Sequence, residues 1–249
     1  MTTLDLHGLG VRSHVTVEGE RADELATLLT PLWARCLAPR GGEVDGEAFT
    51  LRLDGDPAPL LQRFTQDVTS AAIKAQRGRL FMFHAGAVTD PGTGRALAYV
   101  APGGTGKTTL SMVLGRTHGY VTDETVGFTP DGRILPYEKP LSVRPQDFAG
   151  VKNETSPDTL GLATVHPDAH LHRFVLIRRD PSLAAPTVER LDLVDAILKL
   201  ATESSSLSSL DRPLQALAAF LDRRPPTLLV TYDEAEHARD VLLDALEES

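Results

Sequence analysis

A glycine-rich stretch with one lysine, APGGTGKT at residues 101–108, carries the clearest chemistry in this sequence. Glycines have no Cβ atom, so the backbone N–H groups around them can turn inward toward phosphate oxygens. The stretch matches the P-loop pattern G-x-x-x-x-G-K-S/T, except that Ala101 stands at the first glycine, where many P-loops tolerate alanine. It therefore predicts a phosphate-binding loop, and a solvated glycine-rich turn is the alternative.

The residues of this loop have separate predicted parts in binding ATP and Mg²⁺. Lys107 is expected to reach the β- and γ-phosphates, and Thr108 to place its hydroxyl on Mg²⁺. The helix that follows points its N-terminus at the anion. The predicted nucleotide contacts are Gly103, Gly104, Thr105, Gly106, Lys107, Thr108 and Thr109.

An acidic pair, Asp123–Glu124, follows the loop after one predicted helix and one short strand. In a parallel sheet the carboxyl ends of neighbouring strands share the edge where ligands bind. A strand running back to that edge brings Asp123 close to the γ-phosphate and Mg²⁺. Phosphoryl transfer needs positioning and charge neutralisation, with one carboxylate to orient or deprotonate the nucleophile. Alternatively, the two acids only end a strand as solvated charges.

The elements that must position these residues follow from the hydrophobic pattern. An apolar run at 80–83 precedes His84, and another at 96–100 leads straight into the loop, which is typical of strands buried on both faces. The alternation of strands and helices predicts an α/β domain with a largely parallel sheet. Further strands are predicted at 119–128, 174–177 and 227–232, and helices at 191–222 and 234–247.

The first part of the chain, residues 1–76, is predicted to form a small N-terminal α/β unit, and residues 77–249 the P-loop core. Pro31 is expected to kink or split a helix predicted over 21–37. Residues 145–170, rich in Pro, Asp, Thr and Gly, are predicted to form a mobile connection. Other elements of the first part are strands at 11–18 and 48–54 and a helix at 58–76.

The composition of the chain excludes several classes of function. The net charge is −9 across 249 residues, which argues against a broad nucleic-acid-binding surface. The single cysteine, Cys36, permits no intramolecular disulfide and fits a reducing compartment. No apolar run approaches the ~18 residues of a membrane span, and the N-terminus does not resemble a secretory signal. We therefore expect a cytoplasmic protein with no nucleic-acid or membrane partner.

Residues 84–128 resemble the kinase core of the HPr kinase/phosphorylase family. The shared features are a histidine followed by small residues about seventeen positions before the loop, the P-loop itself, and a Gly-Tyr strand that ends in an acidic pair. GTGKTTLS at 104–111 is equally similar to the loop of ATP-dependent phosphoenolpyruvate carboxykinase, whose fold core is related. The resemblance implies a P-loop core of this type, and it covers residues 60–145 best.

The resemblance also implies roles for individual residues. Asp123 matches the family's catalytic aspartate, the general base toward an acceptor hydroxyl, and His84 matches the active-site histidine, although a histidine satisfied at the edge of the core is the alternative. Lys107 and Thr108 match the phosphate lysine and the metal-binding hydroxyl, and Glu124 stands where the family often has a second acid. The predicted catalytic residues are Asp123, His84 and Lys107, and the predicted metal ligands are Thr108, Asp123 and Glu124.

Two positions depart from the family pattern. Gly103 stands where HPr kinase/phosphorylase carries a serine, and Ala85 where it carries a glycine. No match to its second signature stretch is found after the acidic pair, so HPr itself is not the expected acceptor. Related enzymes are often oligomers, which leaves a homo-oligomer open.

Other charged groups compete for a part in the chemistry. Asp233–Glu234 follows an apolar strand like a Walker B motif, but Asp233 is expected to cap the next helix. HPDAHLH at 166–172 is expected to be a polar loop, because Pro167 prevents a helix that would align its histidines on a metal. The cations that could reach the phosphate edge are Lys139, Arg144, Arg178 and Arg179.

The sequence therefore predicts an ATP-dependent kinase that phosphorylates a hydroxyl group. We expect the acceptor to be a serine of a protein, a peptide or the free amino acid. Two alternatives stay open: a nucleotide-binding regulator or ATPase without an acceptor, and a small-metabolite kinase in which Asp123 binds the substrate.

Overall fold

The computed structural model describes residues 1–39, 41–148 and 150–248 of the chain. They divide into two compact units, the first made of Met1–Gln76 and Tyr137–Gly161 and the second of Arg77–Pro136 and Leu162–Ser249. The boundaries expected from the sequence put residues 137–161 with the P-loop core, so the structure differs from them there. No helix within the described ranges is both long and apolar enough to cross a membrane.

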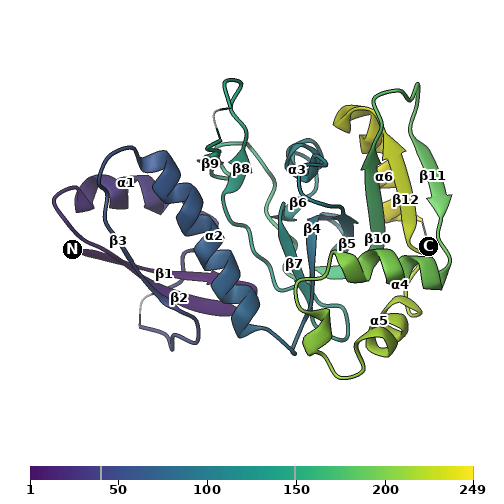
Figure 1. The fold of residues 1–249 in the computed structure, drawn as a ribbon, viewed down its shortest axis with the longest axis horizontal. Helices are drawn as coiled ribbons and strands as arrows, with labels where there is room; N and C mark the ends of the chain where they lie inside the picture. The colour runs from purple at the N-terminus through teal and green to yellow at the C-terminus, as the bar shows by residue number, and fades with distance from the viewer. Residues whose placement is uncertain (40, 149, 249) are drawn as a thin grey trace. The chain divides into compact units, whose positions relative to one another are not determined.

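The first unit is a small sheet with two helices packed against it (Figure 1). Its strands lie in the order β1-β2-β3, with β1 and β2 antiparallel and β2 and β3 parallel. The helix predicted over 21–37 ends at Leu32, directly after Pro31, and a short 3₁₀ turn follows. The elements are β1 (Thr2–Gly8), β2 (Val11–Val17), α1 (Ala22–Leu32), β3 (Ala48–Leu51) and α2 (Pro57–Ala75).

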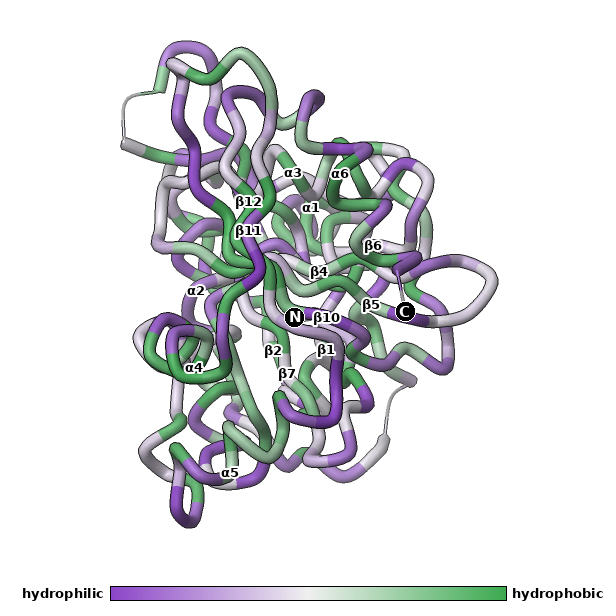
Figure 2. The backbone as a smooth tube through the Cα atoms, turned by 90° about the vertical axis from the view of Figure 1, so that its right-hand side faces the viewer, coloured by the Kyte–Doolittle hydropathy of each residue, from purple (hydrophilic) through white to green (hydrophobic). Residues whose placement is uncertain are grey.

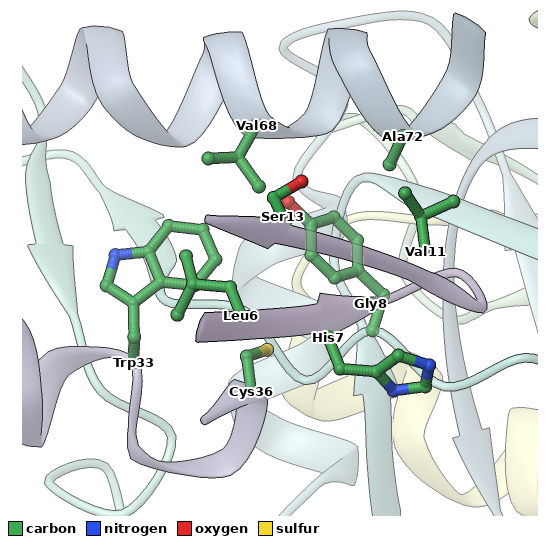
Figure 3. A pocket seen from close by; sticks show the side chains of 10 residues that line it. Leu6, His7, Gly8, Val11, Ser13, Trp33, Cys36, Val68 and Ala72 are labelled. Atoms are coloured by element: carbon green, nitrogen blue, oxygen red, sulfur yellow. The ribbon is translucent and has the colours of Figure 1, made fainter. Parts of the chain in front are cut away.

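Residues 137–161 join this unit through the ring of Tyr137. The ring lies against Gly8, where a Cβ atom would come within 2.2 Å of it, and its hydroxyl is 2.9 Å from Thr69 Oγ1. Figure 3 shows Val68 and Ala72 pointing from α2 toward the strands beside this contact. The cavity there measures about 10 Å³, which is the space of one water and not of a substrate.

The segment 145–170 is less irregular than its composition predicts. It contains strand β9 (Asn153–Thr155), which pairs antiparallel with β8 (Leu141–Val143). The Lys152 N–H donates to Gln62 Oε1 of α2 at 3.0 Å. Residues after 161 belong to the second unit, and Ala149 lies outside the described residues. The segment predicted to be a mobile connection is therefore divided between the two compact units, with residues up to 161 in the first and residues from 162 in the second.

The second unit is a sheet with helices on both faces (Figure 1). The strand order is β11-β12-β10-β5-β4-β6, and β7 pairs with the other half of β4. The strands are β4 (Phe81–Thr89), β5 (Arg95–Val100), β6 (Gly119–Thr122), β7 (Thr125–Phe128), β10 (His170–Arg179), β11 (Thr187–Arg190) and β12 (Leu228–Tyr232).

This sheet is mixed, so the prediction of a largely parallel sheet is wrong. Within the described residues, only β5, β10 and β12 of this sheet pair parallel with one another. Strand β4 is antiparallel to β5, β6 and β7, and β11 is antiparallel to β12. The cause is a tight turn between β4 and β5, in which the Asp90 carboxylate accepts from the N–H groups of Gly92 and Thr93. So short a connection joins antiparallel strands, because a parallel crossover needs a dozen or more residues.

Two hydrophobic cores lie on opposite faces of the sheet. On one face α3 (Lys107–Leu114) and α6 (Ala235–Glu247) pack on residues such as Tyr99, and on the other α4 (Leu193–Thr202) and α5 (Pro213–Leu221) pack on residues such as Ala98. Adjacent strand residues point to opposite faces, which gives this division. Figure 2 shows hydrophilic and hydrophobic stretches alternating along α4, which has one buried and one open side.

Five phenylalanines pack together on the α4 and α5 face of the sheet: Phe81, Phe83, Phe128, Phe174 and Phe220. Phe174 of β10 lies at the centre, with ring centroids 4.9 Å from Phe83, 5.5 Å from Phe128 and 6.4 Å from Phe220. These residues come from β10, β4, β7 and α5. The cluster holds the half of β4 that carries His84 in place.

Candidate phosphate-binding site

The site is built where β5 ends and β4 continues. Val100, the last residue of β5, pairs with Ala85, so residues 81–84 of β4 extend beyond it. Beyond the end of β5, the segment after α4 pairs with the backbone of β4. The His84 N–H donates to the Glu203 carbonyl at 2.7 Å, and the Ser205 N–H donates to the Met82 carbonyl at 2.9 Å. The loop 101–106 therefore leaves the sheet at an edge with satisfied backbone groups.

The loop itself has the conformation that its glycines predict. Gly104 and Gly106 have φ angles of 86° and 110°, in the left-handed region that other residues rarely adopt. Helix α3 begins at Lys107 directly after Gly106, and no side chain caps this N-terminus. Its first N–H groups and the positive end of its dipole therefore face the loop, which is the arrangement that binds phosphate.

The ammonium of Lys107 lies within the curve of the loop. The side chain is 5% exposed, and its Nζ donates to the carbonyls of Ala101 and Pro102. A buried cation held by neutral carbonyls brings a positive charge to the inside of the loop. The predicted contact of this charge with β- and γ-phosphates stays a prediction.

Asp123 and Thr108, two of the predicted metal ligands, lie in contact, and their binding of a metal stays a prediction. The Thr108 hydroxyl donates to Asp123 Oδ2 at 2.8 Å, and the Tyr120 hydroxyl donates to Oδ1 at 3.3 Å. The carboxylate is 4% exposed. Because β5 and β6 are both antiparallel to β4, they run in the same direction and their ends reach the same edge of the sheet.

These two oxygens can form part of a magnesium site. Hydroxyl and carboxylate oxygens suit Mg²⁺, which is usually bound by one or two carboxylates together with phosphate oxygens. Among the described residues no group of three or more His, Cys, Asp and Glu could hold a metal by itself. A metal here would therefore need oxygens from a bound phosphate, which fits the donor set of Thr108 and Asp123.

Glu124 lies at the break between β6 and β7. Its carbonyl accepts from the Ala85 N–H at 3.0 Å, which ties the break to β4. Its carboxylate is close enough to His84 to favour the charged imidazole. The predicted role of Glu124 as a metal ligand stays a prediction.

His84 is a half-buried histidine near the loop lysine. Burial lowers the pKa of its imidazole below the ordinary value of 6.5, and the charge of Lys107 lowers it further against the opposing effect of Glu124. The folded protein therefore favours a neutral His84 at neutral pH. Below pH 6.5 the unfolded chain binds this proton more readily, so the stabilisation from a neutral His84 is lost as the pH falls.

We expect an NMR titration of the His84 imidazole to give a pKa below 6.5 in the intact protein. In Lys107→Met this pKa should rise, because the repelling charge of Lys107 is removed. Lys199→Met should leave it unchanged, since Lys199 is not among the charges that act on His84. An unchanged pKa in Lys107→Met would show that His84 and Lys107 are not neighbours.

The competing acidic pair has other partners. Both carboxylate oxygens of Asp233 lie 2.9 Å from Nδ1 of His237, and this contact raises the pKa of the histidine. The expectation that Asp233 caps the last helix is wrong, because α6 starts at Ala235 with Glu234 at the cap position and no side-chain cap bond. Asp233 follows β12, two strands away from β5, whereas Asp123 contacts the loop helix directly.

The other polar groups singled out by the sequence have separate surroundings. Lys139 is buried in the first unit and donates to the Pro140 carbonyl, and Arg144 lies over the Phe148 ring. The histidines of residues 166–172 bond to different groups: His170 to the Asp168 carbonyl and His172 to the Glu248 carbonyl. Arg178 and Arg179, by contrast, lie at the end of β10 beside the loop.

A pocket of about 770 Å³ adjoins the loop. It lies between residues 100–105, residues 176–179 at the end of β10, and the last turns of α4. The sequence pointed to Arg178 and Arg179 but not to the α4 wall, where Leu198 and Lys199 carry no motif. Only the strand order, which puts β10 next to β5, could have indicated it.

Comparisons with known proteins leave the family open. No protein-family model matches the chain, and no curated protein matches it. Among solved structures, the chain is similar to the Hpr(Ser) kinase/phosphatase from Coxiella burnetii with 13% identity and a TM-score of 0.31, over 67% of this chain and 86% of that chain. This is a distant structural likeness, and it establishes neither family nor activity.

Proposed function

We propose that this protein is an ATP-dependent phosphotransferase that moves the γ-phosphoryl group to a hydroxyl acceptor. The observation that carries the proposal is the contact of Asp123 with Thr108 at the start of the loop helix. The Asp123 carboxylate, the Thr108 hydroxyl and the buried Lys107 would then lie around the terminal phosphate of a nucleotide bound by the loop. We expect the acceptor to be a serine of a protein, a peptide or the free amino acid.

Each residue has a defined part in the proposed reaction. The loop N–H groups and the α3 N-terminus bind the phosphates, and Lys107 neutralises charge that develops on the transferred group. Mg²⁺, when bound, supplies further charge neutralisation, and Thr108 and Asp123 are the residues that would hold it. Asp123 orients the acceptor hydroxyl and takes its proton. The acceptor oxygen forms a bond to the γ-phosphorus, and the bond from that phosphorus to the ADP oxygen breaks, so that ADP leaves. His84, whose pKa is lowered by burial and by the charge of Lys107, is proposed to contribute a neutral imidazole to the same site.

The proposal is tested by incubating the protein with γ-labelled ATP, Mg²⁺ and candidate acceptors. Label on serine or on a peptide serine supports the proposed kinase. Label released only to water identifies an ATPase or regulator, and label on a sugar or other metabolite identifies a small-metabolite kinase. Omitting Mg²⁺ should abolish transfer, because the charge on the phosphates is then not neutralised.

A further inference from the structure

The pocket beside the loop has the size and walls of a small-molecule site. Its volume of about 770 Å³ lies within the roughly 300–1,000 Å³ usual for such sites. The aliphatic side chains of Leu176, Ile177, Leu198 and Leu229 form its apolar part. Leu198 is 59% exposed and lies on α4 across from the loop, so a flat apolar group can cover it. Covering this side chain would remove apolar surface from water.

The charges around the pocket favour an anionic ligand. Arg178, Arg179 and Lys199 line it against one carboxylate, that of Glu203, although the whole chain has a net charge of −9. Arg179 is already paired with Glu234, whereas Arg178 is an exposed residue whose Nε donates to Thr231 Oγ1 at 3.2 Å. The positive groups therefore stand at the mouth of an otherwise aliphatic pocket.

The position of the pocket decides which part of a ligand it suits. Lys107, Thr108 and Asp123 mark the reacting end of the proposed site, and none of them lines the pocket. An acceptor hydroxyl must meet the γ-phosphorus beside Asp123. The pocket instead meets the loop at residues 102–105, on the side of β10, with β4 and β6 on the other side of β5. The position of the pocket therefore suits the non-reacting end of the nucleotide, which is the end opposite the γ-phosphate.

We propose that the pocket between residues 100–105, the end of β10 and α4 binds the nucleoside part of ATP, with Leu198 packed on the base. Arg178 and Lys199 then lie near the start of the phosphate chain. This inference rests on the proposed function, because it assumes that the loop holds the triphosphate. Affinity for the nucleoside comes from aliphatic packing, since the pocket lining contains no aromatic side chain.

The test compares the binding of Mg²⁺·ATP with that of Mg²⁺·tripolyphosphate, which fills the loop without a nucleoside. Isothermal titration calorimetry on Leu198→Ala should show ATP bound about fivefold to tenfold more weakly, because part of a buried leucine contact is lost. Tripolyphosphate affinity should stay within a factor of about two, as no charge changes. Val194→Ala, on the same helix, 64% exposed and outside the pocket, is the matched control and should change neither affinity.

A second measurement does not depend on a variant. In methyl-labelled protein, the Leu198 methyl resonances should shift with ATP and not with tripolyphosphate, whereas those of Leu214 on α5 should not shift with either. Equal effects of Leu198→Ala on both ligands, or no effect on ATP, would overturn the nucleoside site while leaving the loop site standing. If wild-type protein binds neither ligand, the proposed function fails and the nucleoside site fails with it. An ATP-independent shift of the Leu198 methyls by a phosphoacceptor would assign the pocket to the acceptor instead.

Discussion

Replacing Asp123 by asparagine is expected to lower the rate of phosphoryl transfer by about 10²- to 10⁴-fold, the range for loss of a general base. The asparagine keeps the size of the side chain and an oxygen that can accept from the Thr108 hydroxyl, so the local structure should persist. ATP binding should weaken much less than transfer, because the loop and Lys107 are unchanged and only one of the two proposed Mg²⁺ ligands is altered. The measurement is transfer of label from γ-labelled ATP, together with ATP affinity by calorimetry.

The matched control is Asp233→Asn. Asp233 also follows a strand of this sheet, but its carboxylate bonds to His237 and not to the loop helix. We expect this variant to transfer phosphate at nearly the wild-type rate. If Asp233→Asn abolishes the reaction and Asp123→Asn does not, the base and the metal-side carboxylate have been assigned to the wrong strand.

Replacing Phe174 by alanine should lower the free energy of unfolding by about 3–5 kcal/mol, the usual cost of deleting a buried phenylalanine. Phe174 is 1% exposed and packs on three other aromatic rings, so the surrounding side chains cannot close the cavity easily. The measurement is urea-induced unfolding followed by circular dichroism. Small domains have only about 5–15 kcal/mol of stability, so this loss is a large fraction of the total.

Two further variants serve as a milder substitution and as a surface control for Phe174→Ala. Phe174→Leu should cost less, because a smaller cavity remains. Leu214→Ala, on α5 and 51% exposed, should change stability by less than about 0.5 kcal/mol. If Phe174→Ala unfolds at the same urea concentration as Leu214→Ala, the aromatic cluster does not stabilise the sheet.

The local features of the site could be predicted from the sequence, because they depend on neighbouring residues. Glycines at 104 and 106 adopt positive φ angles that other residues rarely adopt, and α3 starts at Lys107, directly after the predicted loop. The strand into the loop and the strand before the acidic pair are set by short apolar runs. The meeting of Asp123 with Thr108 followed from the expectation that both strands end at one edge.

The order and direction of the strands could not be predicted in the same way. Hydrophobic runs such as 80–83 and 96–100 show that strands are buried but not which strands are neighbours. The turn around Asp90 decides that β4 is antiparallel to β5, and its sequence, DPGTG, was the available signal. The packing of Tyr137 on Gly8 joins residues far apart in the chain. The hydrophobic periodicity of the sequence does not indicate such a contact.

The chain passes from one compact unit to the other three times, after residues 76, 136 and 161. During synthesis the first unit cannot be completed until residue 161 has left the ribosome, although most of its residues have emerged long before. A single cut cannot separate the two halves either, since a fragment that starts at residue 77 would carry β8 and β9 without the helix and the sheet that they accompany. Domain-swap chimaeras of this protein therefore need three junctions, and limited proteolysis at one site should leave the fragments associated.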